Sequence, residues 1–170
     1  PFEQTDVSLD GSRQSHRIAL SLTGPVADLS LTVAGQQDAE GWRGRLESLQ
    51  VTPEGRARWT LDAAAAFDYA SATQDVRLER ACLRNAPASL CVDVDWRERE
   101  GTIAARLSDL PLATLDPFLA HAFGAPLSAY GSLAADIALR RPAAGALEGH
   151  VRVNSPNGGL RIDPESGREL

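Results

Sequence analysis

The sequence feature that most constrains the fold is an alternation of apolar and polar residues, repeated in short runs along nearly the whole chain. Leu29, Leu31 and Val33, for example, alternate with Asp28, Ser30 and Thr32. Successive side chains on a β-strand point to opposite faces, so each run predicts a strand with one apolar and one polar face. Runs recur about every ten residues, which is typical of a sandwich, a barrel or an elongated antiparallel sheet. Helical periods do not alternate with the runs, which argues against a parallel α/β sheet.

The alternation predicts strands near 16–23, 28–34, 42–51, 57–61, 64–70, 73–83, 89–96, 102–108, 130–139, 146–153 and 159–162. One segment departs from it, because apolar residues between 112 and 122 recur at steps of three and four residues. This spacing predicts a short helix over 116–123, with Asp116 as its cap, Pro117 in its first position and Gly124 at its end. We expect the helix to lie on the apolar face or to close one end of it. The fold class is therefore all-β with one short helix.

The composition of the chain excludes some classes of function. The net charge of −6 and the pI near 5.0 argue against nucleic-acid binding, which needs a basic face. No apolar run approaches the roughly 20 residues that span a bilayer, so a membrane anchor would lie outside this chain. The chain of 170 residues begins at Pro1, contains no Met and closes on a polar, turn-like stretch over 163–170. We therefore expect residues 1–170 to be a single internal segment of a longer β-rich protein.

Residues that carry chemistry are sparse. His16, His121 and His150 are scattered without metal-ligand spacing, so we expect no metal. The densest carboxylates, around Asp93 and Asp95, fall on the polar side of a strand and are expected to be solvated. No nucleophile elbow or phosphate-binding glycine loop is present. We predict that the chain is not an enzyme and has no cofactor.

Cys82 and Cys91 lie on adjacent predicted strands joined by a hairpin. Keeping Leu78 and Val94 on one apolar face places Cys82 on that face and Cys91 on the other. Directly bonded cysteines need Cβ atoms on a common side, and a bulge near the turn would restore that parity. In an oxidising compartment we expect a disulfide; the alternative is two separate buried thiols.

Several short motifs occur in a recognisable order: Trp42-x-Gly44-x-Leu46, Trp59-x-Leu61, Cys82-Leu83, Leu90-Cys91, Trp96, Leu110-Pro111-Leu112, Gly131-x-Leu133 and Leu147-x-Gly149-x-Val151. In this order they resemble the periplasmic region of the TamB family, the translocation and assembly module subunit related to the AsmA-like group. The resemblance covers roughly residues 8–162.

The resemblance implies a periplasmic protein of Gram-negative bacteria, anchored in the inner membrane through a segment outside this chain. It implies a curved sheet that forms an open, lipid-lined groove, sometimes called a β-taco. Its implied partners are phospholipid acyl chains and TamA, an outer-membrane barrel protein. The implied roles are phospholipid movement toward the outer membrane and outer-membrane protein assembly.

Under this interpretation the apolar strand faces line the lipid groove. The lining residues we expect are Leu20, Leu31, Val33, Leu46, Val92, Val94, Trp96, Ile103, Ile137 and Val151. A second interpretation is a structural or assembly scaffold, in which a second sheet closes that face and the sheet edges pair with partner or client strands. A carbohydrate-binding β-sandwich is a third, weaker interpretation. Sequence does not separate the first two, because a closed core and an open lining have the same pattern.

Overall fold

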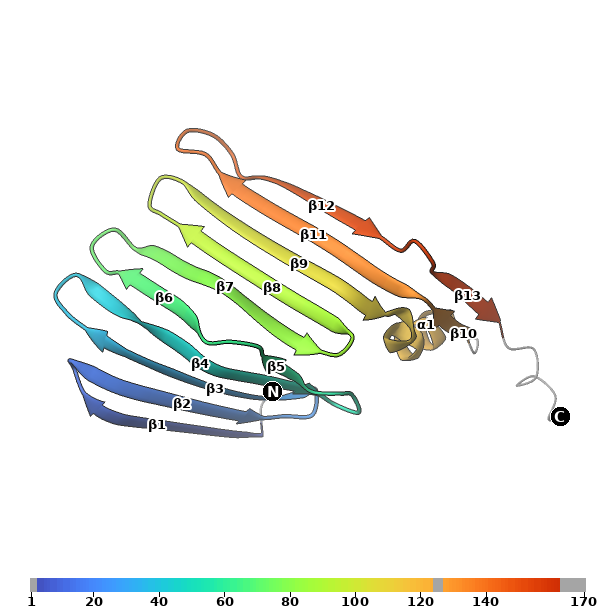
Figure 1. Cartoon of the computed structure of the whole chain (residues 1–170), viewed down its shortest axis with the longest axis horizontal. Helices are drawn as coiled ribbons and strands as arrows, with labels where there is room; N and C mark the ends of the chain where they lie inside the picture. The colour runs from blue at the N-terminus through green and yellow to red at the C-terminus, as the bar shows by residue number, and fades with distance from the viewer. Residues whose placement is uncertain (1–2, 124–126, 163–170) are drawn as a thin grey trace.

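The computed structural model describes residues 3–123 and 127–162. Most of them form one eleven-stranded sheet (Figure 1). Its strands are β1 (Gln4–Ser12), β2 (Ser15–Thr23), β3 (Ala27–Gln37), β4 (Gly41–Pro53), β5 (Trp59–Leu61), β6 (Ala65–Ala70), β7 (Asp75–Asn85), β8 (Ala88–Trp96), β9 (Gly101–Pro111), β11 (Ser132–Arg141) and β12 (Glu148–Asn154).

The sheet is an open antiparallel meander, in which nearly every strand pairs with the next along the chain. Strands β5 and β6 share one position between β4 and β7, so they act as a single interrupted strand. Strands β1 and β12 form the two edges. In Figure 1 the strands lie side by side in a single layer from the blue β1 to the red-orange β12. The prediction of an all-β fold built on an elongated antiparallel sheet is confirmed, and the sheet is not closed into a sandwich or barrel.

The remaining elements gather at one end of the sheet, where β9 ends (Figure 1). They are a 3₁₀ turn η1 (Leu112–Leu115), helix α1 (Asp116–Phe123) and a short antiparallel pair of β10 (Leu127–Tyr130) and β13 (Gly159–Ile162). This pair continues the β11–β12 hairpin past a break at Gly131. At Gly131, where φ is +92°, a Cβ would lie 2.4 Å from the carbonyl oxygen of Asn157, so the close approach of the chains requires glycine.

Helix α1 has the predicted bounds, but its first residue makes a different contact from the predicted one. The Asp116 carboxylate accepts a hydrogen bond of 2.7 Å from the backbone N–H of Ala129 in β10. Ala129 is buried, and a buried N–H without an acceptor is costly, so Asp116 ties the helix to the short strand pair. Gly124, the predicted end of the helix, and the polar stretch 163–170 lie outside the described residues.

The sheet bends because its strands carry bulges at matching levels. Glu47 in β4 has no partner in β3, and Glu79 and Arg80 in β7 face the single residue Asp93 in β8. Between them lies the interruption at 62–64 that separates β5 from β6. A bulge bends its strand and increases the local twist, so three adjacent irregular strand positions curve the sheet.

Two strands were not predicted: β1, and β10, which the predicted strand over 130–139 touches at a single residue. Strand β1 pairs in full register with β2, yet Val7 and Leu9 are the only large apolar residues in it. Two apolar residues give too short an alternation for sequence analysis. The strand forms because its backbone pairs with the exposed edge of β2, a contact that the local sequence does not encode.

The protein has almost no conventional core. The buried apolar residues among the described ones are four alanines, and none of the large side chains is fully buried. The chain exposes 11754 Å², whereas a compact monomer of its size exposes about 8,100 Å². Within the described residues the substantial contacts of each strand are with its sheet neighbours, and η1 and α1 contact β10. The sheet is therefore a single layer whose two faces meet the surroundings.

We expect Asp116→Ala to destabilise the end of the sheet that carries α1. It leaves the buried N–H of Ala129 without its acceptor, at a cost of about 1–3 kcal/mol. Amide hydrogen exchange should show faster exchange at Ala129, with little change in β7 and β8. Asp116→Asn keeps an acceptor oxygen and serves as the control; equal exchange in both variants would contradict the assignment.

Candidate functional site

The ten predicted lining residues share one face of the sheet. Directly paired residues on antiparallel strands point to the same side, and the register pairs Leu20 with Leu31, and Val94 with Ile103. The bulges in β4 and β7 keep the later residues in phase with the earlier ones. We call this side of the sheet the apolar face. That it holds lipid stays a prediction.

The apolar face is nearly free of charge. Among described strand residues with register partners, His16 and Arg141 are the only ones on this face that can be cationic, and no carboxylate lies on it. Both occupy the end of the sheet opposite α1. Between the two ends the face consists mainly of Leu, Val, Ile and Ala side chains, which leaves a continuous apolar surface.

The exposure of these side chains shows that the apolar face is uncovered. Aliphatic residues on the inner strands, such as Leu31 and Val94, are half-buried because they pack sideways against each other. At the edges the same face is open: Leu9 on β1 is 69% exposed and Val151 on β12 is 65% exposed. A soluble protein rarely leaves a contiguous apolar surface of this extent bare, so it marks an interaction site.

The charge-free region is bounded at one end by aromatic residues. The Trp42 indole donates a hydrogen bond of 2.6 Å to Nε2 of His16 and lies 5.4 Å from the Phe67 ring. Farther along the same end, Trp96 lies flat over Gly101, where a Cβ would come within 2.6 Å of the indole. The Arg141 guanidinium stacks on Trp96, with Cζ 4.3 Å from the ring centroid. Both tryptophans therefore pack along the apolar face of the sheet.

At the other end, a groove of about 730 Å³ separates the β4–β5 turn from η1. Apolar side chains dominate its lining, among them Trp59, Ala88, Leu110 and Leu115. Trp59 and Leu110 also belong to the apolar face, by their pairing with Val51 and Leu133. The groove therefore continues the apolar face beneath η1.

The opposite face is polar, and several of its carboxylates are paired with arginines. Asp93 contacts Arg80 at 3.3 Å, so this predicted solvated carboxylate is held in an ion pair. Arg97 donates two hydrogen bonds of 3.0 Å to Asp95 and holds the pKa of that carboxyl below its ordinary value. Such exposed pairs contribute at most about 1 kcal/mol each, and a carboxyl held ionised is a poor general acid.

Two further pKa shifts are also caused mainly by hydrogen bonds. The pKa of Asp38 is lowered by hydrogen bonds from the backbone N–H groups of Glu40 and Gly41. The pKa of Arg106 is raised by its hydrogen bond to Asp136, at 2.7 Å. These shifts favour the charged forms and belong to turn and cross-strand contacts on the polar face.

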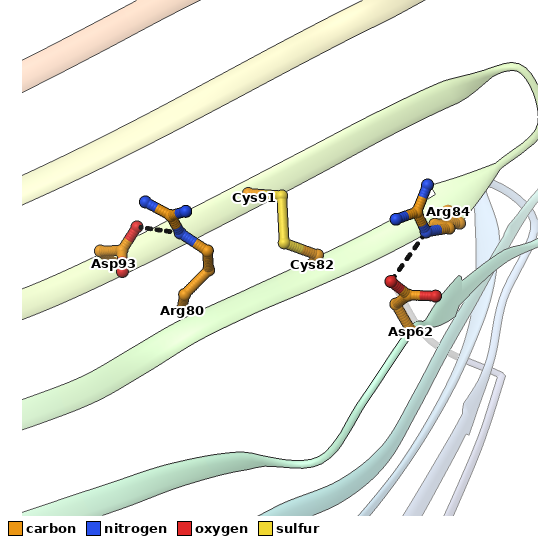
Figure 2. Close-up of a disulfide and its surroundings, with 6 residues drawn as sticks. All are labelled: Asp62, Arg80, Cys82, Arg84, Cys91 and Asp93. Atoms are coloured by element: carbon orange, nitrogen blue, oxygen red, sulfur yellow. Dashed lines mark hydrogen bonds and ion pairs between the residues drawn. A yellow bond between two sulfur atoms is a disulfide. The ribbon is translucent and has the colours of Figure 1, made fainter.

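Cys82 and Cys91 are directly paired in the register and their sulfurs are bonded (Figure 2). The bulge at Glu79 and Arg80 restores the parity that a regular β7–β8 pairing would have broken. The disulfide consequently lies on the polar face, beside the Arg80–Asp93 and Arg84–Asp62 ion pairs, away from the lipid lining we predict (Figure 2).

The described residues hold no cluster of His, Cys, Asp or Glu with the composition and proximity of a metal site. Across the same residues, no helix has the length and apolar character needed to cross a bilayer.

The fold and the face together define a class: open single-layered β-proteins with one continuous aliphatic face. The family model described as "TamB, N-terminal domain" matches residues 1–167, so the chain belongs to the TamB family. The resemblance drawn from the motif order is confirmed. The chain thus belongs to a TamB-type envelope protein with a periplasmic portion, in a family of transport and assembly proteins with a TamA-like partner. No solved structure matches it significantly.

We expect the Cys82→Ala/Cys91→Ala double variant to lose about 2–3 kcal/mol of folding free energy, since the bond closes a loop with a separation of nine residues. Chemical denaturation measures the loss. Alkylation of the unreduced protein under denaturing conditions, followed by mass measurement, should find no free thiol. Reaction at both cysteines before reduction would contradict the bond.

Proposed function

We propose that the apolar face binds the acyl chains of phospholipid, so that this segment forms part of a groove carrying phospholipid toward the outer membrane. The observation that supports it best is a continuous aliphatic face on inner strands that no described element covers. A closed core and an open lining share one sequence pattern, and only the second leaves room for a guest.

The free-energy cost of exposing acyl chains to water favours such a lining. Exposing two acyl chains of about 16 carbons each to water costs on the order of 25 kcal/mol, at roughly 0.8 kcal/mol per methylene. A carrier offsets this cost only with a long apolar wall. From Leu90 to Trp96, strand β8 extends over seven residues, about 20 Å, without a charged side chain on the apolar face.

In the whole protein this segment would lie in the periplasm and be anchored in the inner membrane through another part of the chain. Residues 1–170 would form one internal segment of a longer groove that reaches a TamA-like outer-membrane barrel protein. Family membership supports this arrangement, and with it a role in outer-membrane protein assembly.

A second candidate function is a scaffold that pairs with partner or client strands without binding lipid. One observation favours it: β1 and β12 each leave one edge of the sheet unpaired within the described residues. Such edges readily accept another strand. The scaffold uses the edges and the carrier uses the face, so mutations separate them.

Leu31→Asp tests the proposal, with Ser30→Asp as its control. Leu31 lies on the apolar face and Ser30 is its neighbour on the polar face, so both variants place the same charge on the same strand. Because Leu31 is only half-buried, we expect Leu31→Asp to fold. Its carboxylate should reduce co-purifying phospholipid at least tenfold, measured by lipid extraction and native mass spectrometry.

Ser30→Asp should retain phospholipid at the level of the unmodified chain. Circular dichroism and thermal melting report whether both variants fold. If Leu31→Asp unfolds, the same comparison with Val94→Asp and Ala104→Asp replaces it, since Ala104 is on the polar face beside Val94's strand. A chain that folds and never carries phospholipid would exclude the carrier and leave the scaffold.

A further inference from the structure

Arg141 is the one arginine on the apolar face among the described strand residues with register partners. It lies at the end of β11, in the same cross-strand row as Gly101 and Trp96. An arginine beside an aliphatic surface normally has a carboxylate partner, because an uncompensated charge near low-dielectric material is unfavourable. Here the described ion pairs involve other arginines, and none includes Arg141.

The protein positions this guanidinium without neutralising it. Nη2 donates to the backbone carbonyl oxygens of Arg97 and Glu98, with the latter bond at 2.9 Å, which fixes the side chain against the β8–β9 turn. The guanidinium also lies over the Trp96 ring, with its Cζ 4.3 Å from the ring centroid. Its Nε is buried without a hydrogen-bond acceptor. Neutral carbonyls and an indole stabilise a cation but leave its full positive charge available to an anion.

The neighbouring arginines differ in this respect. Arg97, at the same turn, is paired with Asp95 and lies 3.9 Å from Glu100. Arg140 is adjacent in sequence but alternates to the polar face, where it is exposed and opposite Glu148. Arg141 alone in this group combines membership of the apolar face with the lack of a carboxylate contact.

The row next to Arg141 is aliphatic. Leu139 precedes it by two residues on the same face and is paired with Ile103, which in turn is paired with Val94. A cation on an indole, directly adjoining an aliphatic wall, matches the two halves of a phospholipid. The phosphodiester carries the negative charge, and the acyl chains follow the wall.

We infer that Arg141, supported by Trp96, binds the headgroup phosphate of a phospholipid whose acyl chains lie along the aliphatic part of the face. This inference rests on the proposed function and adds to it the residue that sets the position and charge preference of the guest. A charge-assisted hydrogen bond at a partly desolvated site is worth about tenfold or more in affinity.

Titration calorimetry of the delipidated full chain tests the inference with three probes. These are short-chain phosphatidylglycerol below its micelle-forming concentration, diacylglycerol with the same acyl chains, and inorganic phosphate. The unmodified chain should bind phosphatidylglycerol at least tenfold more tightly than diacylglycerol. Inorganic phosphate should bind much more weakly than phosphatidylglycerol, since it lacks the acyl chains.

Arg141→Gln should remove this preference and leave diacylglycerol binding unchanged. The control Arg140→Gln removes the same charge from the polar face and should keep the preference. Arg141→Lys retains a cation and should keep part of it, which also covers the case in which Arg141→Gln fails to fold. Thermal melting establishes which variants fold.

Three results overturn the inference, and the first two leave the proposed carrier function intact. The first is equal binding of both lipids by the unmodified chain. The second is a folded Arg141→Gln variant that prefers phosphatidylglycerol over diacylglycerol as strongly as the unmodified chain does. If Arg141→Gln does not fold, the corresponding result is a folded Arg141→Lys variant that has lost this preference completely. Phosphate alone binding as tightly as phosphatidylglycerol would show an anion site unconnected to lipid, which also overturns it. Failure of the unmodified chain to bind either lipid removes the proposed function itself.

Discussion

The structure depends on one constraint: a sheet of eleven strands forms its backbone hydrogen bonds within itself, and no element among the described residues covers its apolar face. Hydrophobic side chains in such a sheet shelter one another only sideways, so even Leu31 and Val94 remain half-buried. The strand ladder therefore holds the fold together, while much of the hydrophobic free energy is left for a guest. A ligand with hydrocarbon chains of matching length would bury the apolar face. Because it would bind only the folded protein, it would also raise the free energy of unfolding.

The register keeps that surface continuous across the strands. Because side chains alternate with a period of two, a slip of one residue in any pair would turn a whole strand's apolar set to the polar side. The bulges at Glu47 and at Glu79–Arg80 absorb extra residues without such an inversion, since apolar pairs on the same face recur on both sides of each bulge. They are Val33–Leu46 and Leu31–Leu49 around Glu47, and Leu78–Val94 and Ala81–Val92 around Glu79–Arg80. They also place charged residues where ion pairs form on the polar face, as for Arg80 with Asp93. Curvature, phase and surface charge thus have a common origin in the irregular strand positions.

The sequence predicted the parts of this structure that rest on local pattern. The alternation identified the inner strands, and the three-to-four spacing identified α1 with its observed bounds. It missed β1 and β10, which form by pairing with β2 and β13, and it misassigned the Asp116 contact, which depends on where β10 folds. Whether the apolar face is open was not predictable, because alternation records which side is apolar and not what lies over it. Arg141 was overlooked for a related reason: its significance comes from the lack of a carboxylate contact such as the neighbouring Arg97 makes, and only the folded structure shows that difference.

An uncovered face also has consequences for how a guest would move. A pocket with one deep minimum holds its ligand, whereas adjacent strands in this sheet present similar aliphatic rows, as from Leu31 to Leu49 or from Val94 to Ile103. Acyl chains that move from one such row to the next would leave one aliphatic surface for a similar one. The free-energy barrier to this movement would therefore come mainly from the headgroup. A cation at the rim, where Arg141 lies on Trp96, would then set the position at which a lipid pauses and its orientation along the strands. The aliphatic surface would provide affinity for the acyl chains, and Arg141 would set the orientation of the bound lipid.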